Sequence, residues 1–381
     1  MIERMDALML PLNWQKVRLG DICEIVKGQQ INKISLNNTD KYPVINGGID
    51  FLGYTNKFNV SKNTIAISEG GTCGYVRFMT SNFWSGGHNY SLQKISNKVN
   101  NLCLYHILKS YEKDIMKLGV GSGLKNIQLK ALKDFEILLP PLNEQSAIAN
   151  ILSALDRYLC ALDALILKKE SVKKALSFEL LSQRKRLRGF NQDWQRVRLG
   201  DIGKPCMCKR VMKHQTTRYG EIPFYKIGTF GNTADAFISK KLFLEYKTKY
   251  SFPKKGDILI SASGTIGRAV IYDGKPAYFQ DSNIVWIDND EILVKNDFLF
   301  YAYSNVKWNT EHTTILRLYN DNFRNTLIPL PPLNEQSAIA DILSDLDNEI
   351  ASLKNKKRQF ENIKKALNHD LMSAKIRVLE K

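Results

Sequence analysis

The chain has 381 residues, of which 44% are hydrophobic, and this is enough for two or three globular domains with buried cores. Its 55 basic and 38 acidic side chains give a formal net charge of +17, which favours a polyanionic partner such as nucleic acid or an anionic membrane surface. The sequence has no apolar run of about 20 residues and an N-terminus that carries acids, so we expect a cytoplasmic protein without a membrane span or signal peptide.

Two strings of residues occur twice in the same order, which indicates a tandem duplication. Trp-Gln-Lys-Val-Arg-Leu-Gly-Asp-Ile at 14–22 returns with one change at 194–202. Leu-Pro-Pro-Leu-Asn-Glu-Gln-Ser-Ala-Ile-Ala occupies 139–149 and again 330–340. The copies lie roughly 180–190 residues apart, too far for the repeats of a solenoid, so we predict a pair of duplicated domains.

Each copy opens with a globular segment in which short strand-like runs alternate with turn residues. A Gly-Thr-x-Gly element lies between two such runs in both copies, at 71–74 and 264–267. It lacks the third glycine and the βαβ context of a dinucleotide site, so we interpret it as a tight turn. The strand-like runs are 64–68 and 75–78 in the first copy and 257–261 and 269–272 in the second. The pattern predicts two similar domains that are mostly β with a few helices.

A long helical pattern follows each Pro-Pro pair. Asn143 and Asn334 are suited to capping these helices, and Glu144 and Glu335 are well placed for the helix dipole. Apolar residues recur at spacings of three and four, as in a coiled-coil seam, and we expect the first helix to end at Gly189. The seam positions are Ile148, Ile151, Leu152, Leu155, Leu159, Leu162, Ile166, Leu176 and Leu180, then Ile339, Ile342, Leu343, Leu346, Ile350, Leu353, Phe360, Ile363, Leu367 and Leu371.

The simplest partner for each long helix is its own duplicate, because so narrow a stripe cannot bury itself alone. We expect an antiparallel coiled coil of two helices, each up to about 45 residues and so roughly 65 Å long, with an approximate two-fold axis. Two independent surface helices are the alternative.

No catalytic constellation is visible. The chain contains neither a phosphate-binding P-loop nor a His-Glu-x-x-His zinc motif, and its five histidines share no metal spacing. The six cysteines are not matched between the copies, and Cys206-Met-Cys208 has no second pair nearby, so free thiols are favoured over zinc. We therefore expect a chain that is not itself an enzyme and binds no metal or cofactor.

Basic and amide side chains beside glycine turns are candidates for contacts with DNA. Asn and Gln can read adenine edges, Arg and Lys can read guanine or neutralise phosphates, and a merely solvated polar loop is the alternative at any single position. The candidates are Lys27, Gln29, Gln30, Lys33, Thr72, His88, Asn89 and Lys125 in the first copy and Lys209, Arg210, Lys213, Thr265, Arg268, Asn283 and Arg317 in the second.

With these motifs, the chain resembles the specificity subunits (HsdS) of type I restriction–modification systems. The resemblance rests on the two Leu-Pro-Pro-Leu-x-Glu-Gln helix starts, the two Trp-x-x-Val-x-Leu-Gly-Asp-Ile strings and the Gly-Thr-x-Gly turns, and it covers essentially the whole chain. It implies an α+β protein with two target recognition domains, at 1–142 and 190–333, and two spacer helices, at 143–189 and 334–381. Each domain would read one half of a bipartite, asymmetric DNA site.

The resemblance also implies the partners. Two modification subunits would carry S-adenosylmethionine and methylate adenine, and restriction subunits that use ATP and Mg²⁺ would complete the assembly. Because identical partners need equivalent surfaces, the repeated helix starts are candidates for docking, although they could equally serve only to cap and pack. These docking candidates are Leu142, Asn143, Glu144, Gln145, Leu333, Asn334, Glu335 and Gln336. The competing interpretation is a coiled-coil adaptor that does not read DNA sequence.

Overall fold

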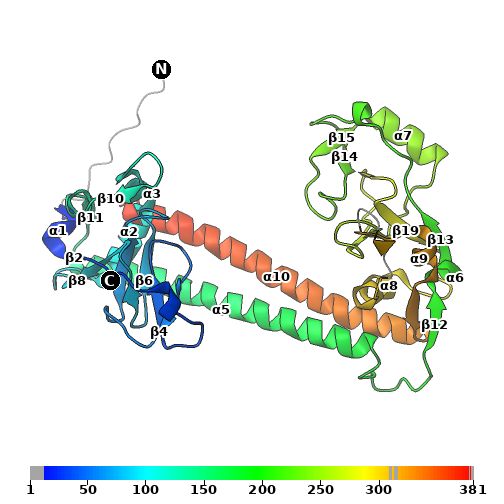
Figure 1. Ribbon diagram of the computed structural model, residues 1–381, viewed down its shortest axis with the longest axis horizontal. Coiled ribbons are helices and arrows are strands. Elements are labelled where there is room, and N and C mark those ends of the chain that lie inside the picture. The colour runs from blue at the N-terminus through cyan, green and yellow to red at the C-terminus, as the bar shows by residue number, and fades with distance from the viewer. Residues whose placement is uncertain (1–12, 309–310, 313–315, 377, 379–381) are drawn as a thin grey trace. The chain divides into compact units, whose positions relative to one another are not determined.

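The computed structural model describes residues 13–308, 311–312, 316–376 and 378 (Figure 1). They form two compact units: the described residues up to 164 with those from 355 onward, and residues 165–354. Each unit therefore combines one globular domain with part of both long helices, α5 (Leu142–Leu181) and α10 (Leu333–Met372). Among the described helices, none is long and apolar enough to cross a lipid bilayer.

The globular part of the first unit is built on small, mostly antiparallel sheets. A four-stranded sheet has the order β2-β8-β5-β6, a three-stranded sheet has the order β4-β3-β7 with β3 parallel to β7, and β1–β11 and β9–β10 form pairs. Its strands are β1 (Gln15–Arg18), β2 (Glu24–Lys27), β3 (Tyr42–Ile45), β4 (Gly53–Thr55), β5 (Thr64–Ser68), β6 (Val76–Met79), β7 (Trp84–Ser85), β8 (Asn89–Gln93), β9 (Gly119–Val120), β10 (Asn126–Ile127) and β11 (Glu136–Leu139). Its short helices are α1 (Leu19–Ile22), η1 (Lys33–Ser35), α2 (Asn101–Ser110), α3 (Glu112–Lys117) and α4 (Leu129–Lys133).

The second unit repeats this plan. The sheet orders β13-β19-β16-β17 and β15-β14-β18 and the pairs β12–β22 and β20–β21 correspond one by one to those of the first unit. Its strands are β12 (Gln195–Arg198), β13 (Gly203–Cys206), β14 (Ile222–Tyr225), β15 (Ala236–Ile238), β16 (Ile258–Ser261), β17 (Ala269–Ile271), β18 (Tyr278–Phe279), β19 (Ile284–Asn289), β20 (Glu311–His312), β21 (Leu316–Arg317) and β22 (Leu327–Leu330). Its short helices are α6 (Leu199–Ile202), η2 (Lys213–Gln215), α7 (Lys240–Lys249), α8 (Asn296–Ala302), η3 (Tyr303–Asn305) and α9 (Asn320–Asn325). The predicted duplication of one mixed, β-rich fold is confirmed.

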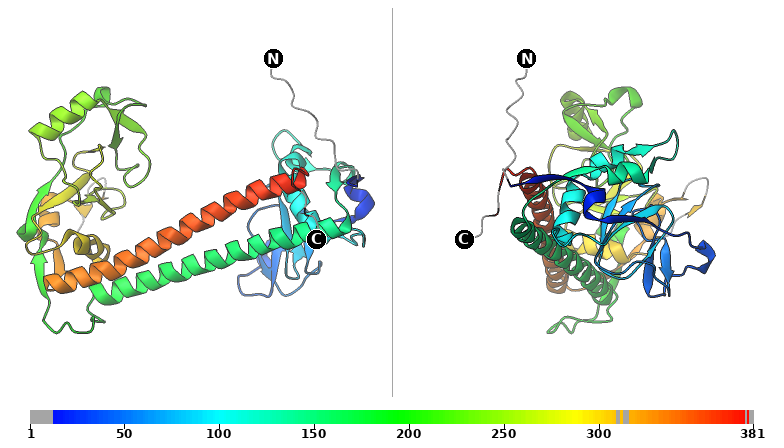
Figure 2. Two further views of the ribbon diagram at one scale, coloured as in Figure 1. Left: turned by 180° about the vertical axis from the view of Figure 1, so that it is seen from behind. Right: turned by 90° about the vertical axis from the view of Figure 1, so that its left-hand side faces the viewer.

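The core of each domain is closed by residues from both long helices. In the first unit, Leu371 and Met372 at the end of α10 join the core cluster that also holds residues from the start of α5. Figure 2 shows the red end of α10 at the blue and cyan elements of this domain. In the second unit, Leu180 and Leu181 at the end of α5 join the start of α10. Burial of such side chains contributes about 1.5–3 kcal/mol each, so the long helices are part of the domain cores.

The two long helices are antiparallel within each unit. In the first unit Lys357 Nζ lies 2.6 Å from Asp163, and Lys364 pairs with Asp156, so residue numbers rise along α5 as they fall along α10. In the second unit Lys354 lies 2.6 Å from Glu170. Such partly exposed pairs contribute up to about 1 kcal/mol each, and they help to fix the register of an apolar seam.

The helix boundaries differ from the prediction. Helix α5 ends at Leu181 rather than Gly189, because the chain turns at Gln183, which has a φ of 60°. Both long helices begin at the leucine after Pro-Pro, where the Pro141 carbonyl accepts from the Gln145 N–H at 2.9 Å, so Asn143 lies in the first turn and not at the cap. Two predicted seam residues are in fact exposed, Ile151 by 37% and Ile363 by 50%.

Buried His106 on α2 should make the first unit sensitive to acid. Burial lowers the pKa of its imidazole to about 4, although nearby Asp156 opposes the shift, and its Nε2 faces Ser153 Oγ at 3.5 Å. The folded state thus favours the neutral ring, so its stability contribution is complete above about pH 6.5 and is lost as the pH falls towards 4. We expect the free energy of unfolding of the wild type to fall by about 3 kcal/mol more than that of His106→Gln between these pH values, as measured by urea unfolding. Equal decreases in the two proteins would show that protonation of His106 is not the cause of the acid sensitivity.

Candidate nucleic-acid interface

Four segments of the first domain meet at one end of its four-stranded sheet. The Glu69 N–H donates to the His88 carbonyl, and the Ile127 N–H donates to the Glu69 carbonyl, both at 2.9 Å. The Thr72 N–H donates to the Gly47 carbonyl at 2.8 Å. The turn after β5 therefore joins the loops after β3 and before β8 to the β9–β10 hairpin.

Several predicted contact residues come together on this loop surface. Lys27 and His88 are exposed and lie near the same carboxylate, that of Glu69. The Gln30 side chain packs over Gly87, whose missing Cβ would lie 2.5 Å from Nε2 of Gln30. Thr72, on the turn after β5, is half-buried. The cluster offers donors of both amide and cationic type, as DNA contacts require.

The remaining first-domain candidates divide into exposed residues and one correction. Gln29, Lys33 and Lys125 are exposed, with Lys33 on the short helix η1. Asn89 is only 2% exposed, and its amide donates to Ser85 Oγ at 2.9 Å and to a neighbouring carbonyl. The prediction that Asn89 contacts DNA is therefore wrong for this structure, because its amide is used inside the domain.

The second domain builds a matching loop surface that repeats two of these three backbone hydrogen bonds. The Ala262 N–H donates to the Asn283 carbonyl at 2.8 Å, and the Leu318 N–H donates to the Ala262 carbonyl at 2.9 Å. These bonds match those of Glu69, so Ala262 corresponds to Glu69, Asn283 to His88 and Arg317 to Asn126. Equivalent backbone positions thus carry a carboxylate, an imidazole and an amide in one domain, and a methyl, an amide and a guanidinium in the other.

Cationic side chains gather on the second loop surface. Arg210 is exposed and pairs with Asp281 at 2.8 Å, and Arg317 donates to the Ser282 carbonyl at 3.0 Å. Arg268 is exposed and reaches Asn232 Oδ1 at 3.5 Å. The other candidates are Lys209, Lys213 and Thr265, all exposed, and Asn283, which accepts from Ser263 Oγ.

The Gly-Thr-x-Gly elements are tight turns, as predicted. Gly71, Gly74, Gly264 and Gly267 have φ between 65° and 85°, a region that favours glycine. A Cβ on Gly74 would lie 2.7 Å from the Met116 backbone nitrogen. The first of these turns therefore packs closely against helix α3.

The repeated glutamates turn inward, which revises the docking prediction for them. Glu144 is 4% exposed and accepts from Trp14 Nε1 at 3.2 Å, and Glu335 is fully buried and accepts from Trp194 Nε1 at 2.9 Å. Arg186 also donates to Glu335, at 2.7 Å, and this pairing raises the pKa of the guanidinium. The two repeated strings of the sequence thus meet in space and tie each domain to the helix that follows it.

The repeated glutamines form a second internal tie. Gln145 accepts from the Asn100 N–H at 2.7 Å and donates to the Pro140 carbonyl at 2.7 Å. Gln336 makes the matching bonds to the Lys295 N–H and the Pro331 carbonyl, both at 2.8 Å. Both amides are buried, so a docking surface at the helix starts reduces to the exposed residues, which are Leu142, Asn143, Leu333 and Asn334.

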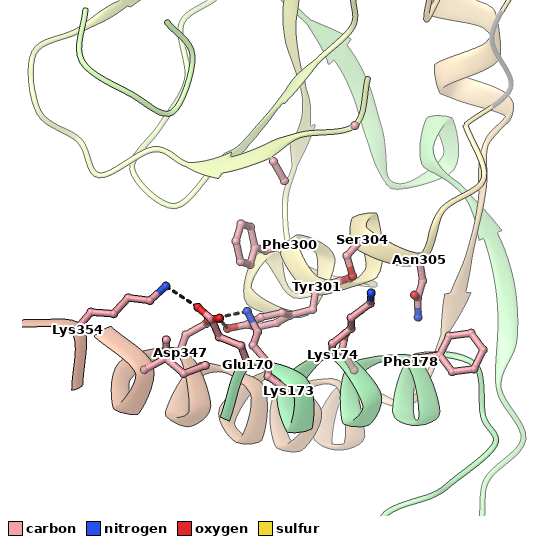
Figure 3. Close-up of a pocket in the computed structure, with 14 residues that line it drawn as sticks. Glu170, Lys173, Lys174, Phe178, Phe300, Tyr301, Ser304, Asn305, Asp347 and Lys354 are labelled. Atoms are coloured by element: carbon pink, nitrogen blue, oxygen red, sulfur yellow. Dashed lines mark hydrogen bonds and ion pairs between the residues drawn. The ribbon is translucent and has the colours of Figure 1, made fainter. Parts of the chain in front are cut away.

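A groove of about 690 Å³ lies inside the second unit, between the long helices, α8 and the second Gly-Thr-x-Gly turn (Figure 3). Two ion pairs cross it: Lys173 with Asp347 at 2.5 Å, and Lys354 with Glu170. The Tyr301 hydroxyl donates to Asp347 at 3.0 Å. Because most of its charges are already paired, the groove has little capacity left for an anion.

The described residues contain no group of three or more His, Cys, Asp or Glu side chains that could hold a metal ion. Cys208 is buried, and burial raises the pKa of its thiol to about 12, so it stays protonated near neutral pH. Cys206 is half-buried, and burial raises its thiol pKa as well. This environment disfavours the thiolates that zinc binds.

Comparison with known proteins places these features in a family. A family model described as the type I restriction modification DNA specificity domain matches residues 11–170 and 191–362. A Haemophilus influenzae protein named as a type I restriction enzyme specificity subunit is 40% identical over 323 residues, which cover 80% of this chain and 81% of that protein. A type I restriction enzyme specificity subunit of Methanocaldococcus jannaschii is 27% identical over 410 residues, which cover 99% and 96%. A crystal structure of the type I restriction–modification S subunit from M. genitalium shares the fold, with a TM-score of 0.69, 24% identity and coverage of 96% and 97%.

Proposed function

Because the chain belongs to the type I restriction–modification DNA specificity family, we propose that its two recognition domains read the two halves of a bipartite, asymmetric DNA site. The observation that carries this proposal is the pair of matching loop surfaces. The two backbone hydrogen bonds made by Glu69 recur at Ala262, but the side chains at these matching positions differ. Two readers that share a fold and differ in their contact residues are suited to two different half-sites.

The proposed contacts to DNA are the exposed and half-exposed polar residues of the two loop surfaces. Guanidinium and ammonium groups reach guanine edges or phosphates, and amides suit adenine. The phosphate contacts make affinity fall steeply with ionic strength, which an adaptor that does not bind DNA would not show. The contact residues are Lys27, Gln29, Gln30, Lys33, Thr72, His88 and Lys125, with Lys209, Arg210, Lys213, Thr265, Arg268, Asn283 and Arg317.

We propose further that the chain supplies recognition and its partners supply chemistry. Two modification subunits would bring S-adenosylmethionine and restriction subunits would bring ATP and Mg²⁺, while this chain is not catalytic and binds no cofactor. The antiparallel helix pairs seen within each unit support a spacer that holds the readers at a set separation. Exposed Leu142 and Leu333 at the two equivalent helix starts suit two identical partners.

The direct test is methylome sequencing of cells that express this chain with its modification subunit. We expect a new bipartite motif with methyladenine in both halves, which disappears when this chain is omitted. If the assembled proteins produce no new motif, the adaptor interpretation is favoured, and salt-dependent duplex binding then decides between the two.

A further inference from the structure

Glu69 is an unusual residue to find on a surface that meets DNA, because a carboxylate repels phosphates. It follows β5, is 8% exposed, and is anchored through its own backbone N–H and carbonyl. Its Oε1 accepts from Lys27 Nζ at 2.7 Å and from the Tyr90 hydroxyl at 3.2 Å. Burial, and then Glu69 itself, raises the pKa of Tyr90 to about 12, so this hydroxyl keeps its proton.

The second carboxylate oxygen, Oε2, is buried and has no hydrogen-bond partner. Leaving such an acceptor unpaired costs about 1–3 kcal/mol or more, so its presence calls for an explanation. The His88 ring lies beside this oxygen, with Nδ1 3.9 Å from Oε2. The His88 side chain is 54% exposed, so its ring lies between the buried oxygen and solvent.

The fold itself does not need this carboxylate. Ala262 occupies the same place in the second domain, with the same two backbone hydrogen bonds, and the position of His88 is taken by Asn283. The first recognition domain therefore has the Glu69–His88 pair and the second does not. Residues that set the specificity for one half-site are expected to differ in this way.

We propose that Glu69 is a positioning residue that holds His88 as an imidazolium when DNA is bound, with Nδ1–H directed at Oε2 and Nε2–H directed at the DNA. The Nε2–H would donate to a hydrogen-bond acceptor on DNA, which is either a guanine edge or a phosphate oxygen. This inference rests on the proposed function, and it names a contact that the first domain makes and the second does not.

The groups around the ring favour this state once DNA is present. Glu69 faces Nδ1, while Lys27 at the end of β2 is held on the other carboxylate oxygen. Tyr90 on β8 is neutral, and Lys125 lies on the hairpin that packs against Gly70 through Asn126. The two lysines oppose a further positive charge in the free protein, and phosphates offset that opposition in the complex.

The test measures binding of the full chain, assembled with its modification subunits, to a duplex that carries the bipartite motif identified by methylome sequencing. A second duplex has the first half-site scrambled. We expect wild-type affinity for the motif to rise about tenfold from about pH 8 to about pH 6, and this rise to vanish in Glu69→Gln and in His88→Asn. His369→Asn, which removes an exposed histidine from α10, should keep the rise.

The outcomes separate the possibilities. If the two variants lose the pH-dependent rise in affinity only on the duplex with the intact motif, His88 contacts a base edge. If they lose it equally on both duplexes, His88 contacts a phosphate. A pH rise that survives in Glu69→Gln or His88→Asn overturns the inference while the proposed function stands. Failure of wild type to distinguish the two duplexes overturns the proposed function, and this inference with it. As a check independent of affinity, ¹⁵N-histidine NMR of the complex should show both nitrogens of His88 protonated at about pH 6, and Glu69→Gln should remove this signal.

Discussion

Exchanging the first recognition domain for that of a relative with another target is expected to change one half of the methylated motif and leave the other half unchanged. The physical reason is that each domain has its own core and its own loop surface. The exchange should replace residues 15–138 and keep Trp14, Glu144 and Gln145, because these side chains tie the domain to α5. Methylome sequencing before and after the exchange gives the result directly.

The reciprocal exchange, of residues 195–329, is the matched control and should change only the other half. It keeps Trp194, Glu335 and Gln336 for the same reason. If either exchange altered both halves together, the model of two independent readers would be wrong. If the motif disappeared while the complex still assembled, the ties at the helix starts would be insufficient to place a foreign domain.

Replacing Glu335 with alanine is expected to destabilise the second unit by about 2–3 kcal/mol, because it leaves two donors without their acceptor. Glu335 is fully buried, and both Arg186 and Trp194 donate to it. Since Arg186 is partly exposed and can turn to water, the expected loss lies below that for a fully buried ion pair. Urea unfolding followed by tryptophan fluorescence measures the change, because Trp194 is itself one of the donors.

Glu349→Ala is the matched control for this prediction. Glu349 lies on the same helix, is 44% exposed and pairs with Lys169 at 2.8 Å, so its loss should cost less than about 1 kcal/mol. Equal destabilisation by the two variants would show that burial of Glu335 is not what makes its interactions strong.

Much of the architecture could be predicted because the duplication exposes it. The repeated strings located the helix starts, and the strand-like runs located β5, β6, β16 and β17 of the two four-stranded sheets. The contact between the two repeated strings could not be predicted, because Trp14 and Glu144 are 130 positions apart in the sequence and form their hydrogen bond only in the folded domain. A signal was present, since both strings are retained in two copies that otherwise differ.

The errors have local causes. Asn89 follows His88 in a polar loop sequence, but it begins strand β8, whose first four side chains are all buried. The end of α5 could not be predicted from breakers, because Leu180 and Leu181 enter the second core well before Gly189. Glu69 was not a candidate, because an acid that repels phosphates is less expected on a DNA-binding surface than a basic or amide side chain.

The way α10 completes the first core has a consequence for protein synthesis. Ribosomes make the chain from its N-terminus, so every residue of the second unit, 165–354, exists before Leu371 and Met372 can cover Ile148 and Leu152. The domain translated first is therefore finished last, and its apolar helix face stays open in the meantime. A stop codon just before Leu371 would leave residues 165–354 in the product and still damage the first recognition domain.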